Sequence, residues 1–226
     1  MKLMSLTLTL LAAQLTFAAA AEENLSIIAK PKAIYEDSSE YNRMNKSYQI
    51  SAQLFGANPT ATTGGGLSVG YFLDRNSMIM ADVTSGRTGD NNLFLDNYDV
   101  TGTSFGLHYK RFFGNSFYAR VGLDQRHIDY KYNYDGIFVS DYDSSMKFTA
   151  DSLGASIVIG NQWQWENFTM GCDWIGATQP LTHTIKNEEL GGNIDQIDRN
   201  RLEKDKKTLV TDLTGQGLRF YLGASF

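Results

Sequence analysis

Apolar and polar residues alternate along most of this chain. In the last segment, residues 217–226, the apolar residues share one parity, and glycine, Arg219, Tyr221 and Ser225 take the other. A period of two is that of a β-strand with one apolar and one polar face. The same reading along the chain predicts eight strands, over residues 46–56, 63–72, 77–85, 100–111, 116–128, 149–163, 168–178 and 208–226.

The connections between these strands alternate in length. Residues 73–76, 112–115 and 164–167 are short links, whereas the links between them are long and polar, such as 179–207. Only the first link on the long side, 57–62, is short. Membrane β-barrels have short turns on the periplasmic side and longer loops outside, and their strands need about 9 to 11 residues to cross. The pattern predicts a barrel with both ends in the periplasm.

Aromatic residues gather near the predicted periplasmic ends of the strands. They are Tyr48, Tyr71, Tyr109, Phe117, Trp163, Phe168 and Phe226. Amphipathic rings suit the headgroup zone and form girdles around membrane barrels. A soluble barrel such as a lipocalin, with its apolar face inside, would show the same period. The girdle, the connection lengths and the terminal aromatic residue together favour the membrane.

In a membrane barrel, the parity opposite the apolar face points into the lumen. It holds Asp82, His108, Lys110, Arg120, Asp124, Arg126, Asp173 and Arg219. Side chains largely fill an eight-stranded barrel, and buried charges must pair because an unpaired one is very costly. We therefore predict a salt-bridged, closed lumen. A narrow ion-conducting pore through the same charges is the alternative.

The last strand has the pattern Leu218-x-Phe220-x-Leu222-x-Ala224-x-Phe226. It resembles the terminal strand of bacterial outer-membrane β-barrels, and residues 46–226 resemble the small OmpA-like and OmpX-like barrels. The resemblance implies an all-β, eight-stranded, antiparallel up-and-down transmembrane β-barrel in the outer membrane of a Gram-negative cell. It also implies that Leu218, Phe220, Leu222 and Phe226 form an assembly signal that the barrel-insertion machinery reads. It implies no activity.

The N-terminal region is expected to contain two further segments. Residues 1–21 have a basic Lys2, an apolar run and a small-residue end at Ala18–Ala21, as in a cleaved signal peptide. Residues 22–45 form a periplasmic lead-in, which is either flexible or folded under the barrel mouth. Pro31 makes an additional strand there unfavourable.

Composition narrows the function classes. The net charge of −5 offers no basis for binding nucleic acid, which needs a concentrated basic face. The single cysteine, Cys172, cannot form an intrachain disulfide. The mean hydropathy of −0.30 is compatible with a membrane barrel, because only every second residue of a strand faces lipid.

Catalytic chemistry is weakly indicated. Outer-membrane lipid A deacylases place a serine two residues after the catalytic histidine, but that position after His108, His127 and His183 holds Lys110, Asp129 and Ile185. His127 and Asp129 could form a base and its orienting carboxylate, without a marked nucleophile. We predict no enzyme, no cofactor and no metal site. A lipid A-modifying enzyme is kept as an alternative.

The predicted outer loops are rich in aspartate and tyrosine, as in residues 130–143, without the spacing of a calcium loop. Tyrosine with glycine, serine and asparagine suits adaptable surface recognition. The mixed charge of residues 179–207 could contact lipopolysaccharide. The sequence thus predicts a monomeric structural or surface-interaction protein. Its expected partners are membrane lipid, lipopolysaccharide, the insertion machinery and a surface ligand of the loops.

Overall fold

The computed structural model describes residues 38–56, 63–91, 97–135, 143–192 and 196–226. Its elements are α2 (Ser39–Met44), β1 (Tyr48–Gly56), β2 (Thr63–Asp74), β3 (Ser77–Asn91), β4 (Asn97–Phe113), β5 (Phe117–Asp135), β6 (Asp143–Trp165), β7 (Phe168–Gly192), α3 (Gln196–Lys206), the π-helix η1 (Lys207–Thr211), β8 (Thr214–Gln216) and β9 (Arg219–Ser225). The expected signal peptide, residues 1–21, lies outside the described residues. Neither α2, α3 nor η1 has the length and apolar content of a membrane-crossing helix.

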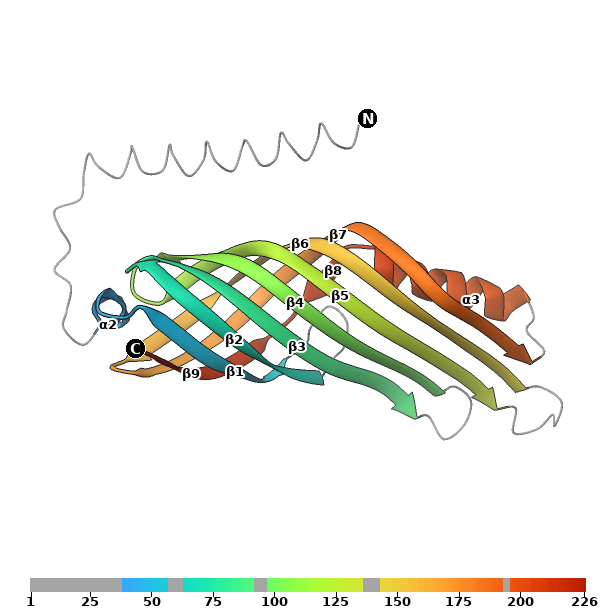
Figure 1. Cartoon of the computed structure of the whole chain (residues 1–226). Helices are drawn as coiled ribbons and strands as arrows, with labels where there is room; N and C mark the ends of the chain where they lie inside the picture. Colours follow the sequence, from blue (N-terminus) through green and yellow to red (C-terminus); the bar gives the residue numbers. More distant parts are fainter. Residues whose placement is uncertain (1–37, 57–62, 92–96, 136–142, 193–195) are drawn as a thin grey trace, which may run out of the picture. The chain divides into compact units, whose positions relative to one another are not determined.

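The strands close into a ring of eight. Each of β1 to β7 pairs antiparallel with the next, and β9 joins β7 to β1. The short strand β8 extends the line of β9 along β7, where Thr214 pairs with Thr178. Figure 1 shows the tilted strands running side by side. The predicted fold class is therefore confirmed.

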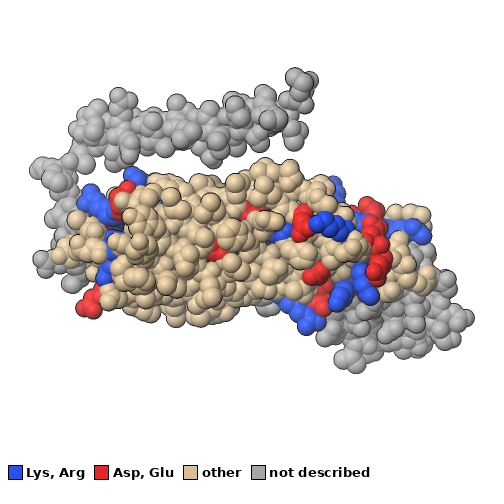
Figure 2. Space-filling model, in the orientation of Figure 1, with Lys and Arg blue, Asp and Glu red and all other residues tan. Residues whose placement is uncertain are grey.

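Alternate side chains point out of the ring and make an apolar belt. The exposed apolar residues include Ile50, Leu67, Val69, Ile79, Val83, Phe105, Leu107, Val121, Leu123, Leu153 and Ile157. In Figure 2 the middle of the molecule is almost free of charged side chains, which gather towards its two ends. Soluble monomers rarely expose apolar patches of more than a few hundred Å². This outer face suits a hydrocarbon environment.

Aromatic rings border the belt at the end of the ring where the tight turns lie. Tyr48 contacts Tyr71 and Phe226, with ring centroids 5.3 and 6.2 Å apart. Trp165 stacks on Phe168 at 6.0 Å, across the turn between β6 and β7. These are the positions of an interfacial girdle, and Trp165 adds to the residues that the sequence pattern indicated.

The strands lengthen steadily around the ring, from 9 residues in β1 to 25 in β7. Strands β3, β5 and β7 continue to Asn91, Asp135 and Gly192, whereas the alternation predicted ends at residues 85, 128 and 178. The predicted long loops are therefore mostly strand. Polar residues and tyrosines without a clear alternation are typical of loops when a segment is considered alone. Here the backbone N–H and C=O groups of these residues pair with those of a neighbouring strand.

The prediction that strand eight begins at residue 208 is wrong. Residues 196–211 form α3 and η1 instead, within the segment that was expected to be a polar loop and the start of a strand. The run from Gln196 to Lys206 lacks alternation and is rich in residues with good helix propensity. Its few apolar side chains, such as Leu202, are buried against the sheet.

Strand β7 departs from simple alternation at bulges. The pairing with β6 slips between Ile159 and Gly160, so Trp174 and Ile175 both face outward, with 46% and 61% exposure. A bulge inserts one extra residue and re-aims the chain beyond it. Cys172, just before this bulge, is buried although the pattern predicts a lipid-facing side chain, and it pairs with the larger Phe220.

Candidate functional site

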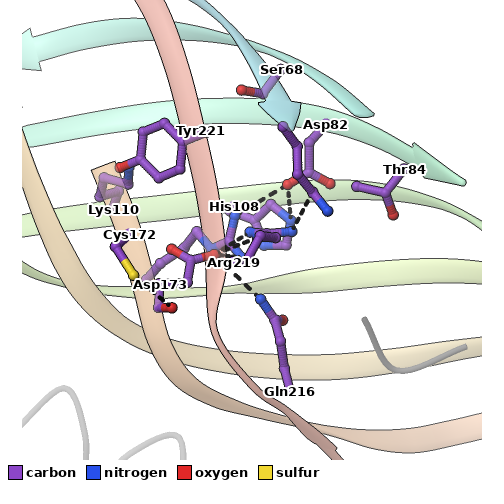
Figure 3. Close-up of polar contacts among 12 residues, drawn as sticks. Ser68, Asp82, Thr84, His108, Lys110, Cys172, Asp173, Gln216, Arg219 and Tyr221 are labelled. Carbon is purple, nitrogen blue, oxygen red and sulfur yellow. Dashed lines mark hydrogen bonds and ion pairs between the residues drawn. The ribbon is translucent and has the colours of Figure 1, made fainter. Parts of the chain in front are cut away.

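The structure places the eight predicted lumen residues on the inner face of the ring. Seven are buried and Asp124 is largely so, with 14% of its side chain exposed. They come from five strands: Asp82 (β3), His108 and Lys110 (β4), Arg120, Asp124 and Arg126 (β5), Asp173 (β7) and Arg219 (β9). Figure 3 shows several of them converging between the strands.

Asp173 is the centre of this cluster. Its Oδ2 atom accepts hydrogen bonds from Arg219 Nε at 2.6 Å, Arg120 Nη2 at 3.3 Å and Gln216 Nε2 at 3.3 Å. The Tyr118 hydroxyl donates to its other carboxylate oxygen. Charge-assisted hydrogen bonds of this kind compensate the cost of burying a carboxylate. Tyr118 and Gln216 are also part of the site. Because both side chains are neutral, the pattern of charges in the sequence did not indicate them.

From Asp173 a chain of polar contacts crosses the lumen. Arg120 also donates to Asp82 Oδ2 at 3.1 Å. His108 Nε2 lies 3.3 Å from Asp82 Oδ2 and 3.3 Å from Asp124 Oδ1. Neither ring nitrogen of His108 makes a hydrogen bond among the described residues. The cluster thus contains one residue whose polar atoms are buried and incompletely satisfied.

Lys110 is held differently from the other cations. Its ammonium group lies 4.0 Å from the ring centroid of Tyr118, 5.1 Å from that of Tyr221 and 5.7 Å from that of Phe112. It donates to Gln162 Oε1 at 2.9 Å. It also donates to the Tyr221 hydroxyl at 3.2 Å. Cation–π contacts and neutral acceptors stabilise it.

Arg126 occupies the outer end of the cluster. It donates to Thr214 Oγ1 at 2.9 Å, and this is a contact to a hydroxyl group rather than to an aspartate. Its Nε and Nη2 atoms have no hydrogen-bond partner among the described residues. Beyond Arg126 the inner side chains of β5 become apolar, beginning with Ile128.

Two glycines make room for the imidazole of His108. A Cβ atom at Gly122 would lie 2.3 Å from His108 Nδ1 and 2.3 Å from the carbonyl oxygen of Leu107. A Cβ atom at Gly106 would lie 2.1 Å from His108 Nε2. Any side chain at either position would displace the histidine, so both strands need glycine there.

Water-sized cavities lie beside the charged cluster in the lumen. Two cavities of about 20 Å³ each adjoin the cluster, and Asp82, Thr84, Arg120 and Arg219 line both. A cavity of this size holds about one water molecule. Arg120 and Arg219 thus border both of these water-sized spaces.

At the end of the ring where the tight turns lie, α2 packs against those turns. Arg43 is buried and donates to the carbonyl oxygens of Arg75 and Asn115, both at 2.8 Å, and of Gly114 at 3.1 Å. Its guanidinium group stacks 4.0 Å from the centroid of Phe112. Burial lowers the pKa of Arg43 to about 10, which leaves it charged at neutral pH. Residues 38–45 of the lead-in are therefore folded onto the mouth.

At the outer end, α3 and η1 cover the inner face of the long strands. Leu202 and Val210 pack into an apolar cluster with Val100, Ile128, Tyr130, Tyr132, Met146, Phe148 and Ala150. The Tyr130 hydroxyl donates to Asp205 Oδ2 at 2.6 Å. Tyr130 and Tyr132, predicted to lie in a surface loop, are buried here. Asp141 and Tyr142 fall outside the described residues.

Lys206 anchors α3 to the sheet. Its ammonium group lies 2.7 Å from Glu188 of β7 and 2.8 Å from Glu203. Although partial burial opposes them, these two contacts raise the pKa of Lys206. Helix α3, which lies in a segment predicted to be a loop, is therefore fixed to the inner face of the long strands.

His127 lies on the outside of the barrel, above the apolar belt. Its Nδ1 atom is 2.7 Å from Asp151 Oδ1, and its Nε2 atom is 3.6 Å from Asp129 Oδ2. Lys186 pairs with the other oxygen of Asp151 at 2.9 Å. Both ring nitrogens face carboxylates rather than a hydroxyl nucleophile.

No family model and no curated protein matches this chain. Among solved structures, a major outer membrane protein from Thermus thermophilus is 13% identical over 80% of this chain and 99% of that one, with a TM-score of 0.48. Acinetobacter baumannii CarO2 is 12% identical over 80% and 98%, with a TM-score of 0.49. The N-terminal β-barrel domain of Pseudomonas aeruginosa OprF is 15% identical over 80% and 98%, with a TM-score of 0.33. The chain is similar to these outer-membrane proteins, and its own strand pairing defines the barrel.

Proposed function

We propose that this chain is an integral outer-membrane β-barrel protein with a closed lumen. Its role is structural or one of surface interaction, with membrane lipid and lipopolysaccharide as its surroundings. One observation carries the proposal: the ring exposes an apolar belt while charged side chains point inward, where Asp173 bonds to Arg219 and Asp82 bonds to Arg120. A charge that faces lipid at mid-depth costs about 2 to 4 kcal/mol, so this distribution of charge suits a membrane and not water.

The location is tested by fractionation and by gel mobility. The full chain, expressed in a Gram-negative host, should fractionate with the outer membrane. An unboiled sample should migrate differently from a boiled one, because a closed barrel resists detergent until it is heated. Recovery from the soluble periplasm, with one mobility, would refute the proposal.

Closure of the lumen is tested by conductance in planar bilayers. The wild-type protein should give no stable conductance steps, because the two cavities beside Arg120 and Arg219 each have room for about one water molecule. The competing reading is a narrow ion-conducting pore, which those two cavities favour. Reproducible steps that change with Arg120→Gln or Asp124→Asn, and not with the exterior variant Asp151→Asn, would establish the pore instead.

The alternative function, a lipid A-modifying enzyme, is tested through His127, its candidate catalytic base. Asp151 orients its imidazole as in a catalytic dyad, but the other ring nitrogen faces Asp129. Mass spectrometry of lipid A should give the same profile from cells with and without the protein. A modified species that disappears with His127→Gln would replace the structural role with an enzymatic one.

The assembly role of the last strand is also a proposal. Leu218, Phe220 and Phe226 are outward-facing and exposed, Leu222 is partly buried on the same face, and the backbone of Phe226 bonds to that of Tyr48. Phe226→Ala should slow assembly by the insertion machinery and leave export unchanged. The conservative Phe226→Tyr should assemble normally. Equal assembly of both variants would show that the aromatic ring is not read.

A further inference from the structure

We propose that Asp82, His108 and Asp124 bind a divalent transition-metal ion of the zinc class inside the barrel. The proposed site goes beyond the structural role above and could exist in either a closed barrel or a narrow pore. It is built from three adjacent strands, β3, β4 and β5. Gly106 pairs with Asp82 on one side and with Asp124 on the other, and His108 stands two residues further along β4.

The spacing of the ligand atoms fits a metal. His108 Nε2 lies 3.3 Å from a carboxylate oxygen of Asp82 and 3.3 Å from one of Asp124. One nitrogen or oxygen atom from each of the three residues falls within 4.8 Å of the others. Zinc bonds to such atoms are about 2.0 to 2.2 Å long, so two ligands of a tetrahedral ion stand roughly 3.3 to 3.5 Å apart. The two separations between the histidine and the carboxylates fall in this range.

The imidazole of His108 faces two carboxylates at 3.3 Å without the geometry of a hydrogen bond to either. Only 2% of its side chain is exposed, yet neither ring nitrogen makes a hydrogen bond among the described residues. A buried polar atom without a partner costs about 1 to 3 kcal/mol, and such an atom in a native structure calls for an explanation. A metal ion between the three residues would give Nε2 the bond that the two carboxylates do not.

The three ligand atoms also converge on a common space. The point where a Cβ atom of Gly106 would lie is 2.1 Å from His108 Nε2, 2.6 Å from Asp82 Oδ1 and 2.7 Å from Asp124 Oδ1. Glycine leaves this space free of side-chain atoms. An ion beside that point would contact all three residues, and a larger residue at position 106 would exclude it.

The chemistry of the donors selects the class of metal. One imidazole nitrogen and two carboxylates suit zinc and its neighbours, and the adjoining cavity of about 20 Å³ has room for a water ligand. Arg120 competes for Asp82, since its Nη1 atom lies 3.1 Å from Oδ2. Oδ2 is also the Asp82 oxygen that lies 3.3 Å from His108 Nε2, so the metal would take Oδ1, the oxygen that faces the space beside Gly106.

The test is metal binding by the refolded full-length barrel. Protein stripped with EDTA should take up one equivalent of zinc in equilibrium dialysis, measured by elemental analysis, and His108→Gln should take up none. His127→Gln is the matched control, because His127 also lies between two carboxylates but on the outer surface. It should retain the full equivalent. Zinc should raise the temperature at which wild type loses its unboiled mobility, and should leave His108→Gln unchanged.

Folding is monitored in the same samples by the mobility of unboiled protein. If His108→Gln fails to fold, Asp124→Asn decides, because Asp124 is the most exposed of the three ligands. Loss of zinc from Asp124→Asn with retention in His127→Gln supports the lumen site. No zinc bound to wild type, or zinc that is lost only with His127→Gln, would overturn the proposal. Neither result depends on whether the barrel conducts.

Discussion

The ring at membrane level and the outer extension of β4–β7 use the same strands with opposite chemistry. Along the inner face of β5, Arg120, Asp124 and Arg126 lie within the ring, and Ile128 and Tyr130 follow in the extension. On the outer face the order is reversed, from Leu123 in the belt to His127 and Asp129 above it, where both histidine nitrogens face carboxylates. Polarity thus inverts across the barrel wall near residue 127.

The inversion shows that alternation fixes which residues share a face, while the surroundings decide which face is apolar. Within the membrane, hydrocarbon covers the outside and the polar face must turn inward. Beyond it, water covers the outside, so the sheet buries its apolar face as a soluble protein does. Helix α3 is needed only in this second region, because one curved sheet cannot cover its own apolar face there.

The largest loss of stability is expected when a carboxylate of the polar interior is removed. Asp173→Asn should lower the free energy of unfolding by about 3 to 5 kcal/mol, because Arg219 and Arg120 would remain buried without their shared carboxylate. Urea titration in detergent micelles measures it. Asp99→Asn, which removes the exposed partner of Arg87, should change it far less. Equal losses would mean that the interior pairs matter no more than surface pairs.

The second largest loss of stability is expected from a cavity in the apolar interior of the extension, beneath α3. Leu202→Ala should destabilise the docking of α3 by about 2 to 5 kcal/mol, the usual cost of a large-to-small change at a buried site. Protease cleavage within residues 196–206 should accelerate, while the unboiled mobility of the ring stays unchanged. The exposed Leu213→Ala serves as control. Loss of the unboiled mobility in Leu202→Ala would show that the two regions unfold together.

An added methyl group inside the ring should lower the stability of the barrel by a smaller amount. Gly122→Ala should cost about 1 to 3 kcal/mol, because the new methyl group meets His108 and a backbone carbonyl. Gly215→Ala should be tolerated, since nothing lies within 4 Å of its added Cβ atom. The two variants are compared by the temperature at which the unboiled mobility is lost. Equal temperatures would indicate a loosely filled lumen.

The smallest expected change is the dependence of α3 docking on pH. Lys206 has a raised pKa in the folded state, so its contribution is complete below the unfolded pKa and is lost as pH rises through the folded pKa. Docking of α3 should therefore weaken above about pH 10, by about 1 kcal/mol or less. Protease cleavage of α3 at rising pH measures this. Lys206→Met should remove the dependence, and an unchanged pH profile in that variant would assign it to another group.

Much of the fold follows from the sequence, because a period of two survives wherever one face meets lipid. Leu107 and Leu123 marked the outer face, and Asp82 and Arg120 marked the inner one. The strand ends were less predictable. Residues 129–135 and 179–192 carry polar groups on a water-facing surface, so their composition is that of a loop until a paired strand is present.

The candidate site was only partly predictable for a related reason. Charges on the inner parity were visible in the sequence, but the aromatic cage of Lys110 and the position of His108 between two carboxylates depend on several strands at once. Arg43 in α2 gave no sequence signal, because its acceptors are backbone carbonyls of turns far along the chain.

By itself, the sequence determined that strands alternate an apolar and a charged face and that they come in an even number, because strand periodicity is a local property. Only the tertiary structure decided which aspartate meets which arginine, where polarity inverts, and that residues 196–211 are helical and pack on the inner face of the sheet. Those outcomes depend on register and closure. In a ring, a shift of one residue between two strands changes every contact across the lumen.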